Sequence, residues 1–458
     1  METNVNKELA TQAGDIDLQE VVIIKSDGLE VNIKGGFIGE LNLFEDMYRG
    51  GLYGNILVID TINLPQALGI TGDEYLRLKI TTPSKDTKFL INKTFKVYSI
   101  TDRIMLGDTG KQSYIIHFTS PEVFIDALSP VYKTFKYKTI SSLAAEVFNT
   151  YLAVGSSGKD SGSKFNIIGD TTNSMQFTSP GWRPMKILNW LASKALGAGY
   201  KNPGYLFYES NKGFYFVNTE QLIDIAIKTQ TVYSEYIYMA NNVSSGQESV
   251  ERLGSDINFQ YRKAMDLKVI ETFNGLKNTQ SGYLANRLYT FDVIRKTHNV
   301  TDYDHIDSWN NYKHLGQIGG VAKPLVATGP SSDGSGALRS PVGMNQIYMQ
   351  HDQLYTGVKN NVGDYIEKVM PIRTSTLAEL TNFKLELTVP GRTDIEVGFV
   401  ILLRYPDASP RSETDKNVYR DDELYSGYYI ITAIRHKITH TKHVMVLELV
   451  KDSFTRIK

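Results

Sequence analysis

The sequence predicts a β-rich α+β protein in which two related antiparallel β-barrel domains are accompanied by an α/β domain and an irregular insert. The 458 residues include 28 Tyr and 19 Phe but 3 Trp, and aromatic and β-branched side chains fit the half-buried surface of a sheet. Short alternating segments that end in turn residues fill both ends of the chain, and these two blocks resemble each other. The expected segments are a flexible arm (1–17), a first barrel (18–124), a small α/β domain (125–230), a second barrel (231–261 plus 376–458) and the irregular insert (262–375).

The first block is a run of short strands. Val21–Ile24 leads through Ser26-Asp27-Gly28 into Leu29–Ile33, which predicts a β-hairpin from its turn chemistry. Further strands are expected at 55–60, 74–80, 94–100 and 113–118. Such a series is typical of an antiparallel barrel or sandwich. The polar residues that precede it have no periodicity and predict a mobile arm.

The middle of the chain shows helical signals. Thr139 can cap a helix whose apolar residues recur every four positions, and Pro184 suits the first turn of a second helix. A hairpin is expected over 205–217, turning at Asn211-Lys212-Gly213. Together these features predict a small α/β unit between the β blocks.

The last third begins without a clear pattern and ends with one. Residues 262–375 are polar and rich in turn residues, with a flexible stretch expected at Gly329–Gly336. From Asn382 onward, apolar residues alternate with polar ones, as in Phe383, Leu385, Leu387 and Val389. This period of two predicts strands with one buried face.

The two β blocks share a pattern that suggests an internal repeat. Val97, Ile100 and Ile104 match Ile431, Ile434 and Ile438 at the same spacings. Upstream of each triplet, the segment 72–79 can be laid on 398–404. Two copies of one β unit are more typical of an assembly part than of an enzyme.

Composition excludes several classes of function. The 49 basic and 50 acidic residues leave a formal charge of −1, which argues against a chain that mainly neutralises phosphates. The absence of cysteine excludes disulfides, thiolate nucleophiles and zinc–thiolate sites. No secretory signal and no long apolar run is visible, so a protein without membrane insertion, kept in a reducing compartment, is expected.

Three histidines near the end of the chain form one candidate metal site. His436, His440 and His443 lie close together in sequence, and on a helix the first two would be stacked. Their flanks predict strands instead, and Arg435 and Lys437 beside them would repel a cation. We expect a solvated basic turn at the tip of a hairpin.

Asp302, Asp304, His305 and Asp307 form an acidic cluster that could hold an ion. A calcium loop needs Gly at its sixth position and Glu at its twelfth, and both are missing. We expect a polar loop.

Other candidate motifs are weak. Gly107–Lys111 and Gly155–Lys159 have the composition of phosphate-binding loops without the spacing, so both are expected to be turns. Asp421-Asp422-Glu423 is the densest acidic run, in an expected loop, and a carboxylate pair for glycoside cleavage stays open. No catalytic, cofactor-binding or metal-binding residue is singled out, and no cofactor or enzymatic activity is expected.

Four motifs in order resemble a known family. They are Phe44–Pro65 followed by Ile70–Leu76; Val97–Arg103 before Gln112–Phe118; Trp182–Ala192 before Tyr205–Glu209; and Val389–Gly391 with Gly398 before Gly427–His436 and Leu447–Asp452. These residues resemble the central baseplate hub proteins of T-even-like contractile-tailed bacteriophages. The resemblance covers about 20–300 and 380–455, whereas 300–375 and 405–426 match no motif of the family.

The resemblance implies a structural virion protein of the tail baseplate, made in the host cytoplasm. Hub proteins of this family form homotrimers in which two related tube-type barrels per chain alternate around a ring. Such a ring would join the six-fold tail tube, or its initiator proteins, to a three-fold central spike, beside the baseplate wedge proteins. Tape-measure protein and DNA would pass through its lumen. The alternatives are a hub of a contractile injection or secretion system, and a tail-associated cell-wall hydrolase.

Overall fold

The computed structural model describes most of the chain. The described residues are 12–83, 90–107, 110–153, 164–229, 234–238, 257–272, 274–292, 296–316, 318–319, 344–350, 366–407 and 420–454. Most of the predicted N-terminal arm, the stretches Gly155–Lys159 and Gly329–Gly336, and most of 405–426 therefore lie outside the described residues or at their borders. Among the described residues, no helix is both long and apolar enough to cross a membrane.

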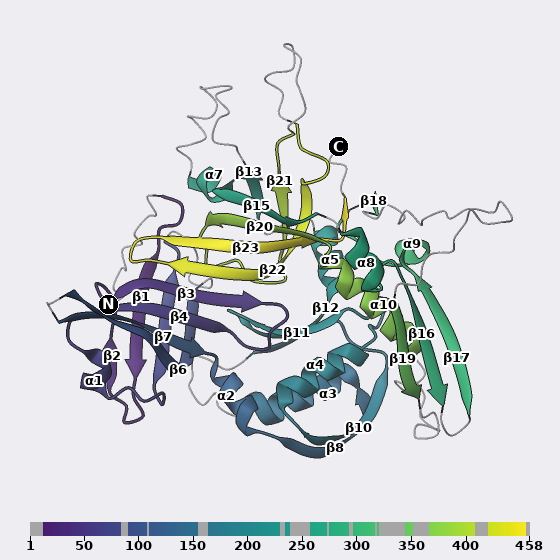
Figure 1. Ribbon diagram of the computed structural model, residues 1–458, viewed down its shortest axis with the longest axis horizontal. Helices are drawn as coiled ribbons and strands as arrows, with labels where there is room; N and C mark the ends of the chain where they lie inside the picture. Colours follow the sequence, from purple (N-terminus) through teal and green to yellow (C-terminus); the bar gives the residue numbers. More distant parts are fainter. Residues whose placement is uncertain are drawn as a thin grey trace, which may run out of the picture.

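The N-terminal block forms an antiparallel sheet with the strand order β3-β4-β7-β6-β5-β1-β2 (Figure 1). Its elements are β1 (Asp17–Ile24), β2 (Glu30–Asn32), β3 (Ile38–Asp46), β4 (Tyr53–Asp60), α1 (Leu64–Leu68), β5 (Tyr75–Thr81), β6 (Ile91–Leu106) and β7 (Lys111–Thr119). The predicted hairpin is confirmed, since β1 pairs with β2 around Gly28, whose φ of 86° suits glycine. The other four predicted strands are confirmed as β4 to β7.

The chain between the two β blocks forms an α/β layer, in which α3 lies beside α4 (Figure 1). It contains α2 (Pro121–Leu128), β8 (Val131–Thr139), α3 (Ile140–Val147) continued by a π-helical turn (Phe148–Leu152), β9 (Phe165–Ile168), β10 (Ser174–Trp182), α4 (Pro184–Lys194), β11 (Tyr205–Ser210), β12 (Gly213–Asn218) and α5 (Thr219–Thr229). The Thr139 side chain accepts a hydrogen bond from Ser142 N, and Pro184 begins α4. Both helix-start predictions and the 205–217 hairpin are thus confirmed.

The prediction of an irregular insert over 262–375 is wrong for much of the described part. After α7 (Ile257–Arg262), which ends where this region begins, come β14 (Lys263–Ala264), β15 (Asp266–Glu271), α8 (Gly275–Gln280), β16 (Ala285–Asp292), β17 (Thr297–Asp304), α9 (His305–Ser308), a 3₁₀ turn (Trp309–Asn311), β18 (Ile318–Gly319), β19 (Met344–Gln350) and α10 (Ile366–Glu379), which runs past its end. Strands β17-β16-β19 form a sheet of their own. Because β17 is largely exposed, its sequence Thr-His-Asn-Val-Thr-Asp-Tyr-Asp lacks the apolar alternation that identifies a strand.

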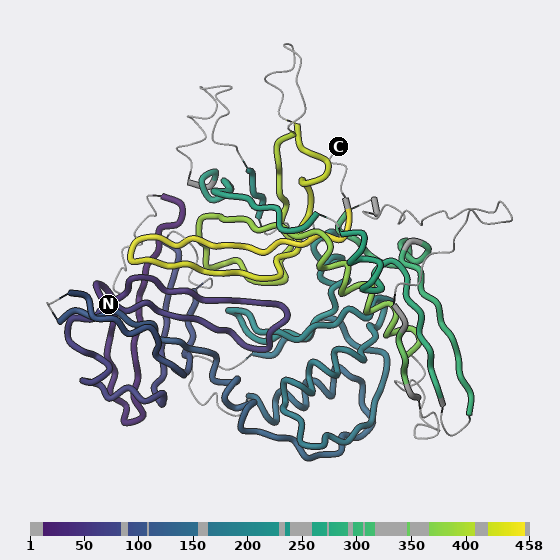
Figure 2. Tube along the Cα trace, in the orientation of Figure 1, coloured from purple at the N-terminus to yellow at the C-terminus, as the bar shows by residue number. Residues whose placement is uncertain are grey.

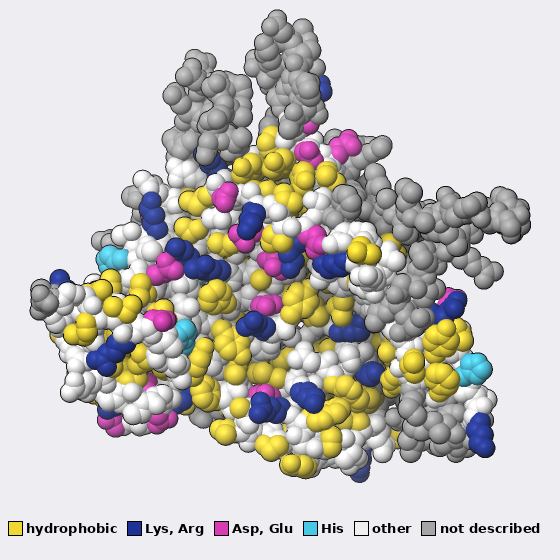
Figure 3. Space-filling view, viewed as in Figure 1, with side chains coloured by type: hydrophobic (Ala, Val, Ile, Leu, Met, Phe, Trp, Pro, Cys, Tyr) yellow, Lys and Arg dark blue, Asp and Glu magenta, His cyan; other side chains and the backbone are white. Residues whose placement is uncertain are grey.

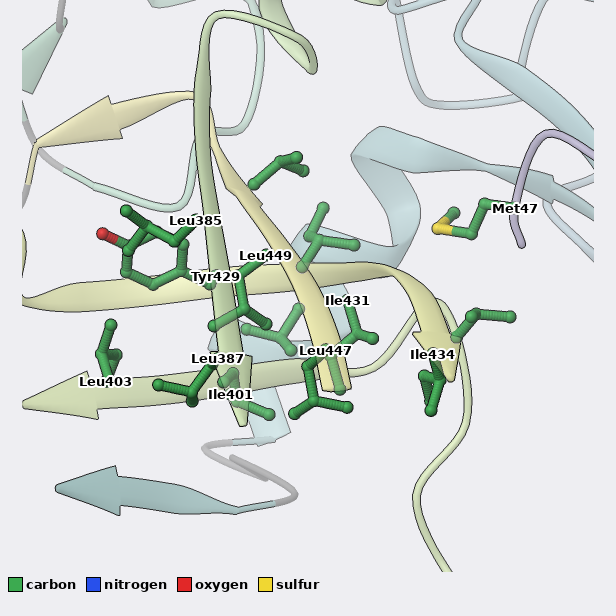
Figure 4. Close-up of a cluster of buried hydrophobic side chains, with 14 of the residues drawn as sticks. Met47, Leu385, Leu387, Ile401, Leu403, Tyr429, Ile431, Ile434, Leu447 and Leu449 are labelled. Atoms are coloured by element: carbon green, nitrogen blue, oxygen red, sulfur yellow. The ribbon is translucent and has the colours of Figure 1, made fainter. Parts of the chain in front are cut away.

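The C-terminal block has β13 (Glu235–Tyr238), β20 (Phe383–Pro390), β21 (Val400–Arg404), β22 (Gly427–Ile438), β23 (His443–Lys451) and β24 (Ser453–Phe454). The predicted alternation in β20 is confirmed, since every second side chain from Phe383 is buried. Figure 4 shows this core, with labelled side chains from β20 to β23 together with Met47 from the N-terminal block: Met47, Leu385, Leu387, Ile401, Leu403, Tyr429, Ile431, Ile434, Leu447 and Leu449.

The described strands do not form the two predicted closed barrels. The strands of both blocks instead belong to one open 14-stranded sheet, because β22 pairs with β3. The first residues of β22 pair with β21, whereas Ala433–Ile438 pair with β3 along the same edge. Figure 2 shows the consequence: the yellow C-terminal hairpin runs beside the purple N-terminal strands.

Candidate functional site

The chain contains the same five-stranded unit twice. The N-terminal copy has the strand order β3-β4-β7-β6-β5, and the C-terminal copy has the order β15-β20-β23-β22-β21. Every neighbouring pair is antiparallel, and corresponding strands follow one another in the same chain order. The topology therefore agrees with the internal repeat that the sequence predicts.

A β-bulge at the same position marks both copies. In the N-terminal copy, Val97 pairs with Phe118 and Ser99 with His117, so Tyr98 is the extra residue. In the C-terminal copy, Thr432 is the extra residue, between residues paired with Leu449 and Glu448. The sequence alignment lays Val97 on Ile431, and it therefore lays one bulge residue on the other. Since a bulge re-aims the side chains that follow it, this agreement is specific to the strand register.

The two copies meet along a seam where β22 pairs with β3. Arg435 Nε donates to Asn42 Oδ1 at 2.9 Å, and Lys437 Nζ lies 3.0 Å from a Glu40 carboxylate oxygen. In Figure 3 basic and acidic side chains lie interspersed across the middle of this face. The outer side of the seam is thus polar and balanced in charge.

The inner side of the seam carries a buried polar chain. His436 Nε2 lies 3.1 Å from Glu45 Oε1, and His436 Nδ1 lies 3.0 Å from His443 Nε2. Because the buried His443 Nδ1 has no hydrogen-bond partner, the proton of His443 is best placed on Nε2, where it is donated to His436. His436 then donates through Nε2 to Glu45. Burial, reinforced by the neighbouring His436, holds the pKa of His443 well below its ordinary value.

A groove of about 480 Å³ opens over the seam and is lined by both copies. Tyr98, His117 and Tyr53 come from the N-terminal copy, while Glu386 and Arg435 come from the C-terminal copy. The bulge at Tyr98 contributes here, because this side chain is 45% exposed. The groove combines aromatic and charged side chains, a composition that suits a protein partner.

The β11–β12 hairpin of the α/β layer forms hydrogen bonds with both copies. The Glu209 carboxylate accepts from Lys93 Nζ at 2.8 Å and from Leu52 N at 2.9 Å in the N-terminal copy. The next residue, Ser210, donates to Glu396 Oε2 at 2.5 Å in the C-terminal block. Burial raises the pKa of Glu396, although the Lys212 ammonium lowers it.

Two of the three candidate histidines are placed differently from the prediction. His436 and His443 are buried in β22 and β23, so the solvated basic turn is wrong for them, and His440 alone stands exposed at the tip. Their side chains face inward because each occupies an inward position of its strand. His436 directs its two nitrogens at different partners, which leaves the three histidines without a common point for an ion.

The residues of the predicted acidic cluster point in different directions and have different partners. Asp302 forms a bidentate pair with Arg287 at 2.6 and 2.8 Å, and Asp304 accepts from Asp307 N at 3.3 Å in a turn. His305 turns the other way into the interior, toward Glu379. The structure therefore does not bring these four residues together.

The remaining candidates lie in turns. Gly107 and Lys111 stand at the two ends of the β6–β7 connection, and residues 155–159 lie outside the described residues. Asp421 lies 3.5 Å from Arg404, and Asp422 accepts from Leu424 N in its own turn. Sequence reasoning missed the buried carboxylates of Glu45 and Glu209. A signal for Glu45 was present, since it continues the inward series of Leu41 and Leu43.

No protein-family model and no curated protein matches this sequence. Among solved structures, a tail protein from Neisseria meningitidis MC58 is 9% identical with a TM-score of 0.48, covering 94% of this chain and 96% of that one. The 43 kDa tail protein of prophage MuSo2 from Shewanella oneidensis is 8% identical with a TM-score of 0.48, covering 95% and 98%. An E. coli component of the type VI secretion system, described as structurally similar to T4 bacteriophage tail proteins, is 8% identical with a TM-score of 0.39, covering 97% and 79%. The likeness is thus to phage tail proteins and to a secretion-system component.

Proposed function

We propose that this chain is a non-enzymatic structural protein that forms the homotrimeric hub ring of a phage-tail baseplate. The observation that carries the proposal is the repeated five-stranded unit, whose copies share strand order and the bulges at Tyr98 and Thr432. Three chains with two copies each would present six similar units around a closed ring. Such a ring can bind a six-fold tube on one side and a three-fold spike on the other.

The seam within the chain suggests how neighbouring chains meet. Ala433–Ile438 of β22 pair with β3, and the repeat makes β6 the counterpart of β22 and β15 the counterpart of β3. Among the described strands, β6 beyond Lys96 pairs only with β7, and β15 pairs only with β20. The second half of β6 in one chain is therefore free to pair with β15 of the next chain.

Exposed apolar side chains lie on both of these edges. Ile104 and Met105 of β6 are 58% and 64% exposed, and Val269 and Ile270 of β15 are 40% and 46% exposed. Unpaired strand edges with apolar side chains favour association. Antiparallel pairing of β6 with β15 would cover them and repeat the β22–β3 seam between chains.

The expected partners follow from this ring. A central spike protein would bind below, tail-tube or tube-initiator proteins above, and baseplate wedge proteins outside, while tape-measure protein and DNA pass through the lumen. The location would be the baseplate of the virion tail. A net charge of −1 is compatible with a part that protein contacts on most sides and DNA only passes.

The absence of cysteine from the chain allows a clean cross-linking test. A variant with Thr101→Cys and Ile270→Cys, oxidised after purification, is expected to give covalent trimers on a denaturing gel that dithiothreitol dissolves. The matched control joins Ile270→Cys with Tyr132→Cys, an exposed position of β8, whose sheet contains neither edge, and should stay monomeric on the gel. Native mass spectrometry of the unmodified chain should show three subunits.

Imaging and an activity assay examine the rest of the proposal. Negative-stain images with a candidate spike protein should show open rings with near six-fold modulation. A chain that stayed strictly monomeric both alone and with the spike protein would overturn the ring. Clearing of a peptidoglycan gel by the purified chain would favour the cell-wall hydrolase. The alternative hub of an injection or secretion system would form the same ring, and it is distinguished by the chain's absence from purified phage particles.

A further inference from the structure

Four ionisable side chains converge at the junction between the 285–314 region, α10 and the C-terminal sheet. They are His305 at the start of α9, His314 after the 3₁₀ turn, Glu379 at the end of α10 and Asp452 between β23 and β24. Each side chain is at most 7% exposed. Segments far apart in the sequence are thus brought together in the interior by titratable groups, away from the β22–β3 seam.

The nitrogen of His314 that faces the cluster carries a lone pair when the ring is neutral. His314 Nε2 lies 3.0 Å from the backbone carbonyl oxygen of Trp309, and a carbonyl oxygen can only accept a hydrogen bond. The ring proton is therefore on Nε2. His314 Nδ1 then faces Asp452 Oδ2 at 3.0 Å and Glu379 Oε1 at 3.9 Å with no hydrogen between them.

The same argument holds for His305. Ser375 Oγ donates its proton to the carbonyl oxygen of Tyr283 at 2.7 Å, so it accepts from His305 Nδ1 at 3.1 Å. The bare His305 Nε2 lies 3.5 Å from Glu379 Oε1, and neither atom has a hydrogen-bond partner. Two imidazole lone pairs and two carboxylates thus border one buried region, where either protons on the imidazoles or a metal cation must offset the carboxylate charge.

The distances between the ligand atoms are within about 0.3 Å of those in a zinc site. Zinc binds imidazole nitrogen and carboxylate oxygen at about 2.0–2.2 Å, so the ligand atoms of a tetrahedral site lie about 3.3–3.6 Å apart. The distances here are 3.0, 3.5 and 3.9 Å. Each histidine also donates a hydrogen bond from its other ring nitrogen to a fixed acceptor, as metal-ligating histidines do. Two carboxylates and one divalent ion give a neutral site.

We propose that His314, Glu379 and Asp452, whose ligand atoms all lie within 4.8 Å of one another, bind a divalent transition-metal ion of the zinc class, with His305 beside the Glu379 carboxylate. The mixed imidazole and carboxylate donors favour such an ion over magnesium or calcium, which take oxygen ligands. The ion would fasten the 285–314 region and α10 to the C-terminal sheet. This site is independent of the proposed ring and would stand if the ring failed.

Cobalt(II) is the probe for the first experiment, because its visible absorption reports coordination. The full chain, stripped with a chelator and dialysed, is titrated with Co²⁺. One equivalent per chain should give an intense band near that of four-coordinate cobalt, and one equivalent of Zn²⁺ should displace it. The isosteric variants Glu379→Gln and Asp452→Asn should weaken binding at least about 100-fold, whereas His440→Ala at the exposed hairpin tip should bind like the parent chain.

Two measurements keep the proposal testable if a variant misfolds. Trp309 is stacked on His314 with ring centroids 3.4 Å apart, so Co²⁺ should quench the fluorescence of the unmodified chain, and Trp309→Phe should lose that quenching. X-ray absorption of the zinc-loaded unmodified chain should show imidazole nitrogen and carboxylate oxygen ligands. Absence of stoichiometric Co²⁺ binding by the parent chain, or equal binding by Glu379→Gln and Asp452→Asn, would overturn the site and leave two buried imidazolium–carboxylate pairs instead.

Discussion

Tyr98 and Thr432 are the extra residues of two β-bulges that occupy the same place in two copies of one strand. The two side chains have little chemistry in common, and they serve different surroundings. Tyr98 stands 45% exposed over the groove, whereas Thr432 is buried and its carbonyl oxygen accepts from Met47 N at 2.9 Å. The two copies therefore share the backbone register of this strand, although the side chain at the bulge is exposed in one copy and buried in the other.

The close approach of Gly391 to His443 can be tested by adding one methyl group. A Cβ at Gly391 would overlap the His443 ring, so Gly391→Ala should lower the free energy of unfolding by about 1–3 kcal/mol in urea titrations. Gly36→Ala is the matched control, because a Cβ there meets open space, and it should change stability by less than about 0.5 kcal/mol. If His443→Ala did not reduce the effect of Gly391→Ala, the clash would not be its cause.

The buried His443 should make stability depend on pH. Its pKa in the folded chain lies well below the ordinary value, so below about pH 6.5 the unfolded state binds the extra proton. The free energy of unfolding should then fall as pH decreases from 6.5 to 5, by up to about 1.4 kcal/mol per unit from this residue. The difference between the parent chain and His443→Asn isolates the contribution, with His440→Ala as control.

A pH profile of His443→Asn that ran parallel to that of the parent chain would contradict this account. His436 faces the His443 ring and Glu45 faces His436, so both are kept unchanged in these variants. Thermal unfolding followed by circular dichroism at each pH is sufficient for the comparison.

The buried Glu209 side chain should contribute far more to the free energy of unfolding than an exposed carboxylate does. Its side chain is 3% exposed and accepts from Lys93 Nζ and Leu52 N, so Glu209→Gln should cost about 2–4 kcal/mol of unfolding free energy. Glu146→Gln, which alters a more exposed pair with Lys133, should change it by at most about 1 kcal/mol. A double-mutant cycle with Lys93→Met measures the coupling, and additive effects would show that the two side chains act independently.

The sequence predicted elements whose signal is local. The alternation of β20, the glycine turn of the β1–β2 hairpin and the Thr139 cap each depend on neighbouring residues, and the structure confirms all three. The internal repeat was also visible, because equivalent strands keep their apolar spacing. The β16–β17 hairpin was missed because its largely exposed strand β17 carries mostly polar side chains.

What depends on distant pairing could not be predicted. The joining of two β blocks through β22 and β3 needs the register of strands far apart in the chain. The same limit applied to His305, which the sequence identified beside Asp302 and Asp304, although its ionisable neighbour in the structure is Glu379. Local spacing placed the histidine in a candidate site, and only the tertiary fold could supply the right carboxylates.

Lys451 offers a test in the opposite pH range. It is 2% exposed, and burial lowers its pKa to about 7, against an unfolded value of about 10.4. Between these values the unfolded state binds more protons, so its contribution to the free energy of unfolding should rise from pH 7 to 9 by up to about 1.4 kcal/mol per unit. Lys451→Met should remove that slope.

The same variant should also be more stable at pH 7. Lys451 Nζ lies 4.4 Å from the centre of the Phe383 ring, an apolar setting that a thioether fills without the desolvation of an ammonium group, so a gain of about 1–3 kcal/mol is expected. Lys442→Met at the exposed end of the β22–β23 hairpin is the control and should keep the parent slope. Loss of stability in Lys451→Met at pH 7 would mean that the hydrogen bonds from Lys451 to the Leu424 and Ser426 carbonyl oxygens outweigh the desolvation of its charge.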